Sequence, residues 1–112
     1  MGLLAYLGGI LGEDKACAFL KAQKYEILER NFHSKFGEID IIAKKDGILH
    51  FVEVKSSSKS YETSYRVDAK KYEKILKTIN YYLLKNDINC DYQLDLLCLN
   101  ALGVDFRENI SV

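Results

Sequence analysis

The sequence has no net charge, no proline, no tryptophan and few cysteines. Its 16 basic and 16 acidic residues cancel, so the balance of the whole chain gives no support for binding to nucleic acid. The lack of proline and tryptophan excludes no class of protein by itself. The three cysteines are widely spaced and form no Cys-x-x-Cys pair, which argues against a disulfide framework and against a structural zinc site. We expect each cysteine to act as a small buried hydrophobe.

The chain also lacks an apolar run long enough to span a membrane. Its opening, MGLLAYLGGIL, is apolar but too short to cross a bilayer. The opening carries no basic segment and is followed by Glu13 and Asp14 rather than by a small-residue cleavage site. We therefore expect a cytoplasmic protein with no membrane partner, in which residues 1–10 are an N-terminal extension or the start of a helix.

A length of 112 residues is enough for one domain with one core. Hydrophobic residues make up 48% of the chain and charged residues 29%, which is typical of a globular protein rather than a disordered one. We predict a single domain over residues 1–112. Residues 100–112 fit either a short final strand or a loosely held end.

The spacing of apolar residues predicts the order of helices and strands. Helical spacing runs from about Leu11 to Lys24 and again from about Val67 to Lys85. Alternating β-forming residues run from Tyr25 to Phe32, and a mostly apolar strand from Tyr92 to Leu99. With a hairpin in between, the order is α-β-β-β-α-β, an α/β fold with a mixed sheet flanked by helices on both faces. The final strand-helix-strand unit requires a parallel crossover.

Each predicted helix has one face that should be buried. In the first, Ala16, Cys17 and Leu20 share a face, and Glu13 falls on that same face. Glu13 is either an acid that complements the helix dipole or a carboxylate that points inward. The second helix is predicted to bury a stripe made of Tyr72, Leu76, Ile79 and Leu83, widened by Ile75 and Tyr82.

A hairpin with paired charges lies at the centre of the chain. Asp46-Gly47 is a strong signal for a two-residue type I′ turn. That turn sets the register so that Asp40 lies directly opposite Glu53, with Lys55 on the same face. Like charges placed opposite each other destabilise a sheet, and burial on both faces makes them costly. We therefore expect a cation between the two acids.

Two opposed carboxylates offer hard oxygen ligands, which suit Mg²⁺ or Mn²⁺. Lys55 can position a water molecule or stabilise developing negative charge beside them. Such a set is suited to the hydrolysis of a phosphodiester. The Glu53-Val54-Lys55 pattern is weak evidence alone, because it also occurs on solvated strands. His33 and His50 have no ligand spacing, and His50 falls on the face opposite Glu53, so neither is assigned to the site.

Basic residues gather after the hairpin although the whole chain is neutral. Between Lys55 and Lys77 there are seven basic residues against three acidic ones, a local excess of four. Such a patch can attract a polyanion, although a lysine stripe is more often a solvated helix face. The candidates for contact with nucleic acid are Lys59, Arg66, Lys70, Lys71 and Lys74. Residues 56–64 form a polar loop that could cover a ligand.

Several motifs occur together in one order along nearly the whole chain. They are Gly12-Glu13, Ile27–Asn31, Gly37-Glu38-Ile39-Asp40 and Phe51-Val52-Glu53-Val54-Lys55, followed by looser matches at Val67, Lys71 and Asp95. With these motifs the sequence resembles the PD-(D/E)XK nuclease superfamily and, within it, the YraN family of small bacterial proteins. The resemblance implies a restriction-endonuclease-like core, similar to that of Holliday junction resolvases.

The resemblance also implies roles for individual residues. Asp40 and Glu53 would bind Mg²⁺ or Mn²⁺, with the backbone carbonyl of Val54 as a further ligand. Lys55 would be the catalytic lysine. Glu13 would be the helix acid that completes the site, in contact with the metal through water. This implication favours the inward-pointing interpretation of Glu13.

The implied activity is a metal-dependent endonuclease that acts on DNA, including branched DNA, as a homodimer. Family members often carry arginines around the site, where this chain has His33, Ser56-Ser57 and Gln93. Fewer guanidinium groups mean weaker bidentate contact with phosphate. The alternative function is a non-catalytic module that keeps the nuclease fold and binds nucleic acid or protein.

Overall fold

The computed structural model describes the backbone of residues 2–56, 67–100 and 103–110, and the side chains of these ranges from residue 12 onward. In chain order, the elements are α1 (Gly2–Ala22), β1 (Glu26–His33), β2 (Glu38–Lys45), β3 (Ile48–Ser56), α2 (Ala69–Lys85), β4 (Tyr92–Asn100) and β5 (Gly103–Arg107). The apolar opening is therefore the start of the first helix rather than an extension. Within the described ranges, no helix has the length and apolar character needed to cross a bilayer.

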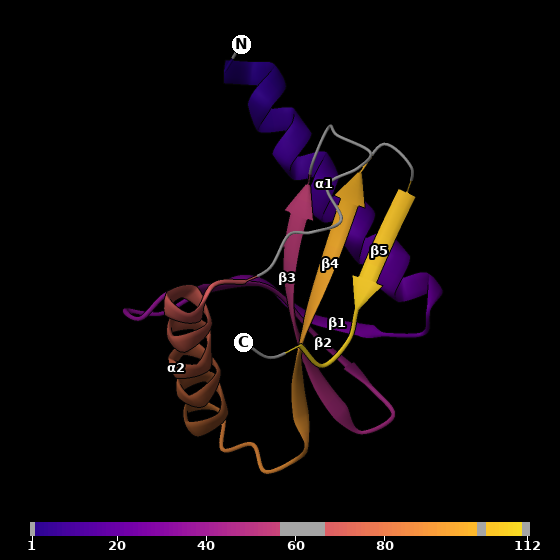
Figure 1. The fold of residues 1–112 in the computed structure, drawn as a ribbon. Helices are drawn as coiled ribbons and strands as arrows, with labels where there is room; N and C mark the ends of the chain where they lie inside the picture. Colours follow the sequence, from indigo (N-terminus) through magenta and orange to yellow (C-terminus); the bar gives the residue numbers. More distant parts are fainter. Residues whose placement is uncertain (1, 57–66, 101–102, 111–112) are drawn as a thin grey trace.

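The strands form one mixed sheet in the order β1-β2-β3-β4-β5 (Figure 1). Strands β3 and β4 are parallel, with α2 between them in the chain, and the other neighbouring pairs are antiparallel. The predicted mixed sheet and the parallel connection are confirmed. β5 pairs with β4, so the tail beyond Asn100 does contain a short final strand.

Helices α1 and α2 cover opposite faces of this sheet (Figure 1). Phe51 of β3 packs in one buried cluster with Ile79 of α2, whereas Val52 packs in another with Leu20 of α1. Successive side chains of a strand point to opposite faces, so each cluster fills the space between one helix and one face. This arrangement agrees with the predicted fold.

The buried face of α1 agrees with the prediction, because Ala16 and Leu20 are fully buried and Cys17 is nearly so. The cysteines of the chain are all free thiols, as expected. Cys17 and Cys98 are buried, while Cys90 is only partly buried.

The buried face of α2 differs from the predicted stripe. Its buried residues are Ile75, Thr78, Ile79 and Tyr82. Tyr72, Leu76 and Leu83 are only partly buried around this cluster, so their predicted place at the centre of the stripe was wrong. The helix can bury Thr78 because its hydroxyl donates to the carbonyl of Lys74 at 3.0 Å and lies 3.1 Å from Oγ of Ser34.

The central hairpin turns at the predicted two residues. Asp46 and Gly47 both have positive φ, 52° and 79°, as a type I′ turn requires. Lys45 pairs with Ile48 immediately beside the turn. The predicted two-residue loop is confirmed.

The register that follows from this turn brings two acids together. The paired residues of β2 and β3 run from the turn to Ile41 and Val52, and one further step along both strands reaches Asp40 and Glu53. Alternation along this strand predicts that Ile39 lies on the face opposite Asp40, but Ile39 joins the buried cluster on the α2 face. The predicted face of Ile39 was therefore wrong, while the hairpin register agrees with the prediction.

Candidate functional site

A polar cavity lies between the acidic end of the central hairpin and helix α2. Its volume is about 410 Å³. The lining residues come from β2, β3, β4, α2 and the turn before β2, and are Gly37, Glu38, Asp40, Glu53, Val54, Lys55, Lys71, Lys74, Ile75 and Leu96. Glu53 belongs to this side because it lies two residues beyond Phe51, which packs toward α2. The cavity therefore brings acids and lysines from separate segments together.

Asp40 is held in place by the neighbouring strand. Its Oδ2 accepts a hydrogen bond from the backbone N–H of Val54 at 2.8 Å. Burial raises the pKa of the Asp40 carboxyl, the bond from Val54 lowers it, and the negative charges of Glu13 and Glu38 raise it further. The net shift is upward, so the site holds this carboxylate at an electrostatic cost.

Glu53 is the most strongly perturbed acid of the cavity. It is only 6% exposed, and burial together with the nearby charge of Asp40 raises its pKa to about 7. The ammonium of Lys71 opposes this rise, with its Nζ 3.4 Å from Oε2 of Glu53. The other oxygen, Oε1, is buried and has no hydrogen-bond partner. A buried carboxylate oxygen without a donor is costly, and it is suited to binding a cation.

Lys55 lies where the sequence places it. It lines the cavity with Glu53, two residues away on the same strand. Lys55 is partly buried. The structure therefore brings three of the predicted site residues, Asp40, Glu53 and Lys55, to one cavity.

Glu13 approaches the site without joining the cavity wall. It lies on α1, which packs on the opposite face of the sheet, and it does not line the cavity. Its charge still contributes to the raised pKa of Asp40, and its Oε2 is buried without a hydrogen-bond partner. Among the described residues, no three His, Cys, Asp or Glu side chains form a group that could hold a metal ion. The acids that line the cavity are Glu38, Asp40 and Glu53. Glu13 lies nearby, outside the cavity wall.

The predicted basic residues separate into distinct groups. Lys71 and Lys74 line the cavity. Lys70 is exposed on α2 and does not line it. Lys59 and Arg66, like most of the polar loop over residues 56–64, lie outside the described residues. The structure therefore places two of the five candidate nucleic-acid contacts beside the acids.

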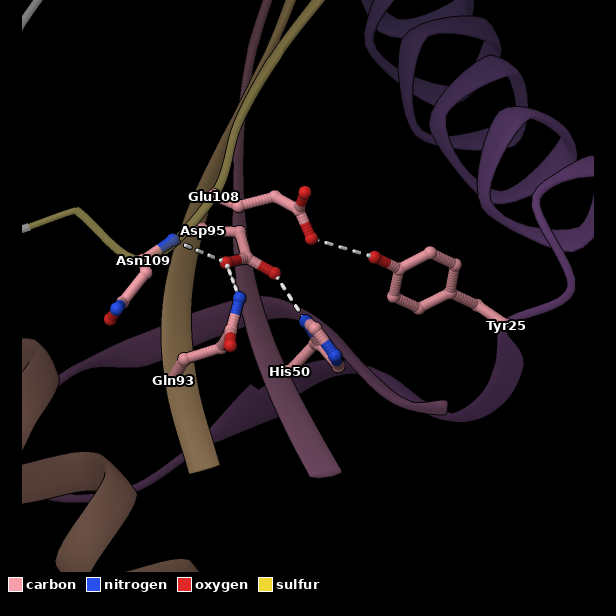
Figure 2. Close-up of polar contacts among 6 residues, drawn as sticks. All are labelled: Tyr25, His50, Gln93, Asp95, Glu108 and Asn109. Carbon is pink, nitrogen blue, oxygen red and sulfur yellow. Dashed lines mark hydrogen bonds and ion pairs between the residues drawn. The ribbon is translucent and has the colours of Figure 1, made fainter. Parts of the chain in front are cut away.

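A second polar cluster, on the α1 side of the sheet, was not predicted. Asp95 is fully buried on β4 and contacts three groups that come from β3, β4 and the tail (Figure 2). Nδ1 of His50 lies 2.6 Å from its Oδ2, and the side-chain amide of Gln93 and the backbone N–H of Asn109 both donate to its Oδ1 at 2.8 Å. The cluster therefore ties the C-terminal segment to the sheet. The sequence signal that could have indicated this cluster is Asp95 itself, an acid within the otherwise mostly apolar strand β4.

Tyr25 borders the same cluster (Figure 2). Its hydroxyl donates to Oε1 of Glu108 at 3.2 Å, and burial with the charge of Glu108 raises its pKa to about 12. A smaller cavity of about 190 Å³ lies here, lined by Tyr25, Lys45, Asp46, Ile48, His50, Gln93 and Glu108. His50 thus lies apart from the carboxylate cavity, as predicted.

Fold and cavity together define a small α/β protein with a cavity lined by acids and lysines between its mixed sheet and α2. Residues 12–99 match the uncharacterised protein family UPF0102, and the chain belongs to this family. The matched range includes the hairpin, α2 and nearly all of β4. The predicted membership of this family of small bacterial proteins is therefore confirmed.

Relatives in several Campylobacter species match over nearly their full length. A UPF0102 protein of Campylobacter jejuni (strain 81-176) is 67% identical over 111 residues, which cover 99% of each chain. One from Campylobacter lari is 62% identical with the same coverage. One from Campylobacter hominis is 56% identical over 112 residues, all of both chains. Their names give the family and no activity.

Proposed function

We propose that this protein is a nuclease of the PD-(D/E)XK type, which hydrolyses phosphodiester bonds in DNA with Mg²⁺ or Mn²⁺ bound at Asp40 and Glu53. The observation that carries the proposal is the buried Oε1 of Glu53, which has no hydrogen-bond partner and lies near the partly buried Asp40. The resemblance of the sequence motifs to the PD-(D/E)XK superfamily supports this reaction type, and the resemblance to resolvases supports branched DNA as the substrate.

The residues of the cavity fit a hard divalent cation. Two carboxylates on adjacent strands supply oxygen ligands of the kind that Mg²⁺ prefers, and water fills the remaining positions in such sites. The backbone carbonyl of Val54 and, through water, Glu13 are the further ligands that we propose. When bound, the metal would polarise a phosphoryl oxygen and lower the pKa of a water molecule.

Other residues would position the substrate. The hydrogen bond from Val54 fixes one oxygen of Asp40, so the acid needs little reorganisation to act as a ligand. Lys55 would orient the attacking water and stabilise negative charge on the phosphate. Lys71 and Lys74, which border the cavity on α2, would contact neighbouring phosphates as point charges.

One observation favours the alternative, a non-catalytic module that binds nucleic acid or protein. Among the described residues, no third metal-ligating side chain joins the two acids in a group that could hold an ion. Under this alternative the lysines would bind a polyanion and no phosphodiester would be cut. Cleavage and metal binding must therefore be measured separately.

The test uses purified protein with plasmid, single-stranded and junction DNA, each with Mg²⁺ or Mn²⁺. We expect cleavage by the wild type and a loss of roughly 10²-fold or more in Asp40→Asn, Glu53→Gln and Lys55→Ala. Glu26→Gln and Lys44→Ala, which alter exposed residues of β1 and β2, are the matched controls. Their activity should be unchanged.

The same proteins are then melted with and without metal. If the wild type cuts none of these substrates and its melting temperature does not change with either metal, the nuclease proposal is wrong. A melting temperature that rises with metal while no substrate is cut would instead favour the non-catalytic module.

We also propose a symmetric homodimer, because a junction must be cut on two strands. Sedimentation velocity with and without junction DNA measures this directly. A monomer under both conditions would contradict the proposed dimer but would not bear on the proposed metal site.

A further inference from the structure

We infer that the ammonium of Lys71 is a built-in counter-cation of the acid pair, which a divalent metal must displace from Glu53 before it can bind. This inference rests on the proposed function and specifies how the same site is regulated. It gives Lys71 a role beyond contact with nucleic acid. The role is that of a positioning residue that competes with the metal.

The contact geometry supports this role. Nζ of Lys71 lies 3.4 Å from Oε2 of Glu53, whose side chain is 8% exposed, whereas the Lys71 side chain is 48% exposed. The acid is thus fixed in the protein while the lysine reaches it from the solvent side. Ion pairs with one solvated partner are weak, so this one can open without disturbing the core.

The start of α2 fixes where the Lys71 side chain begins. Asp68 caps the helix and accepts a hydrogen bond from the backbone N–H of Lys71 at 2.8 Å. The backbone of Lys71 therefore stays in place when the ammonium leaves Glu53. The freed ammonium remains within reach of the cavity, where it can meet a phosphate.

Charge predicts the direction of the competition. The carboxylates of Asp40 and Glu53 together with the Lys71 ammonium carry a net charge of −1, and a divalent ion at the position of the ammonium attracts the carboxylates twice as strongly as the ammonium does. The ion and the ammonium repel each other at these distances, so Lys71 weakens metal binding. A lysine that served only as a phosphate contact well away from the acids would have little such effect.

Lys74 provides a matched comparison. It lines the same cavity from the same helix, one turn further along. Among the ion pairs of the described residues, none joins Lys74 to Asp40 or Glu53. A change at Lys74 therefore alters the charge of the cavity without releasing the acid pair.

The test is titration of metal-free protein with Mn²⁺, followed by calorimetry, for the wild type, Lys71→Gln, Lys71→Arg and Lys74→Gln. We expect Lys71→Gln to bind Mn²⁺ roughly 2- to 10-fold more tightly than the wild type, the size expected for loss of one partly screened charge. Lys71→Arg keeps the charge and should stay near the wild-type affinity. Lys74→Gln should change the affinity by less than Lys71→Gln does.

The outcomes separate this inference from the proposed function. If the wild type binds Mn²⁺ and Lys71→Gln binds it equally or more weakly, the inference is overturned and the nuclease proposal stands. An equal gain in Mn²⁺ affinity in Lys71→Gln and Lys74→Gln also overturns the inference, because the loss of one positive charge anywhere in the cavity would then explain the effect. If none of the four proteins binds Mn²⁺, both proposals fail. Circular dichroism of each variant shows that it is folded.

Discussion

Oδ2 of Asp40 accepts a hydrogen bond from the backbone N–H of Val54 at 2.8 Å. The backbone pairing of β2 with β3 extends to Ile41 and Val52, so the Asp40 side chain continues the cross-strand bonding beyond the backbone ladder. The same carboxylate is a proposed metal ligand. Stability and metal binding therefore depend on one residue, and two substitutions can separate them.

Replacing Asp40 by Ala should destabilise the fold, because it leaves the Val54 N–H without its acceptor. We expect a loss of about 1–3 kcal/mol in the free energy of unfolding. Asp40→Asn keeps an acceptor oxygen and should lose less, while losing most of its Mn²⁺ affinity because the charge is gone. Urea unfolding and Mn²⁺ titration measure the two effects. Wild-type Mn²⁺ affinity in Asp40→Asn would count against Asp40 as a ligand.

Glu53 should make the stability of metal-free protein depend on pH. Its pKa is about 7 in the folded chain against a usual value of 4.5, so between these values the folded state holds a proton that the unfolded state has released. Stability must then fall as pH rises through this window, by about 3 kcal/mol in total, and stay level above it. Glu53→Gln cannot ionise and should lack this fall.

The measurement is urea unfolding of the wild type and Glu53→Gln near pH 4 and near pH 8, with chelator present. The two proteins should be similar at the acidic value. The variant should be the more stable one at the alkaline value. If the free energies of unfolding of the wild type and Glu53→Gln differ by the same amount at both pH values, burial does not raise the pKa of Glu53 in this way.

Local signals were enough to predict the acid pair. Asp46-Gly47 determines the turn, the turn determines the register, and the alternation of side chains in β-strands then places Asp40 and Glu53 on one face. None of these steps needs knowledge of the rest of the fold. This explains why the hairpin and its acids could be derived from the sequence.

The approach of Lys71 to Glu53 was harder to predict, although the sequence contained a signal. Lys71 is four residues before Ile75 and eight before Ile79, and helical spacing therefore puts it on the buried face of α2. The predicted stripe began at Tyr72 instead, one residue further along, and therefore left Lys71 outside the face that was expected to be buried. Which side of a broad apolar face meets the sheet depends on tertiary packing, and periodicity does not specify it.

Gly47 should be needed for its backbone conformation rather than for space. Its φ is 79°, and an added Cβ would meet no atom within 4 Å. Gly47→Ala should therefore cost about 1 kcal/mol through left-handed strain alone. Gly47→Asn should cost less, since Asn adopts this region more readily. Thermal unfolding of the two variants tests the difference, and equal stability of Gly47→Ala and the wild type would contradict the type I′ turn.

The Asp95 cluster could not be predicted because its members meet only in the folded chain. His50 and Asp95 are 45 residues apart in the sequence, and Asn109 contributes a backbone group. The resemblance to the nuclease superfamily included Asp95 among its looser matches but implied no role for this residue. Its position on the α1 side of the sheet separates it from Asp40 and Glu53.

Asp95 should accordingly matter for stability and not for metal binding. Asp95→Ala removes the partner of the buried His50 ring and the acceptor of the partly buried bonds from Gln93 and Asn109, and each polar group left unpaired costs about 1–3 kcal/mol. Asp95→Asn keeps the shape and one acceptor oxygen, so it should be destabilised less and remain folded at room temperature. Asp91→Asn, which alters an exposed acid just before β4, is the control and should unfold like the wild type.

Mn²⁺ titration of folded Asp95→Asn completes the test of this separation. Its affinity should equal that of the wild type, because the substituted group lies on the opposite face of the sheet from the cavity. Urea unfolding in the same buffer should show the lower stability. A folded Asp95→Asn protein with strongly reduced Mn²⁺ affinity would show that the two clusters are coupled through β3 and β4, and that the acid pair depends on the His50–Asp95 contact for its geometry.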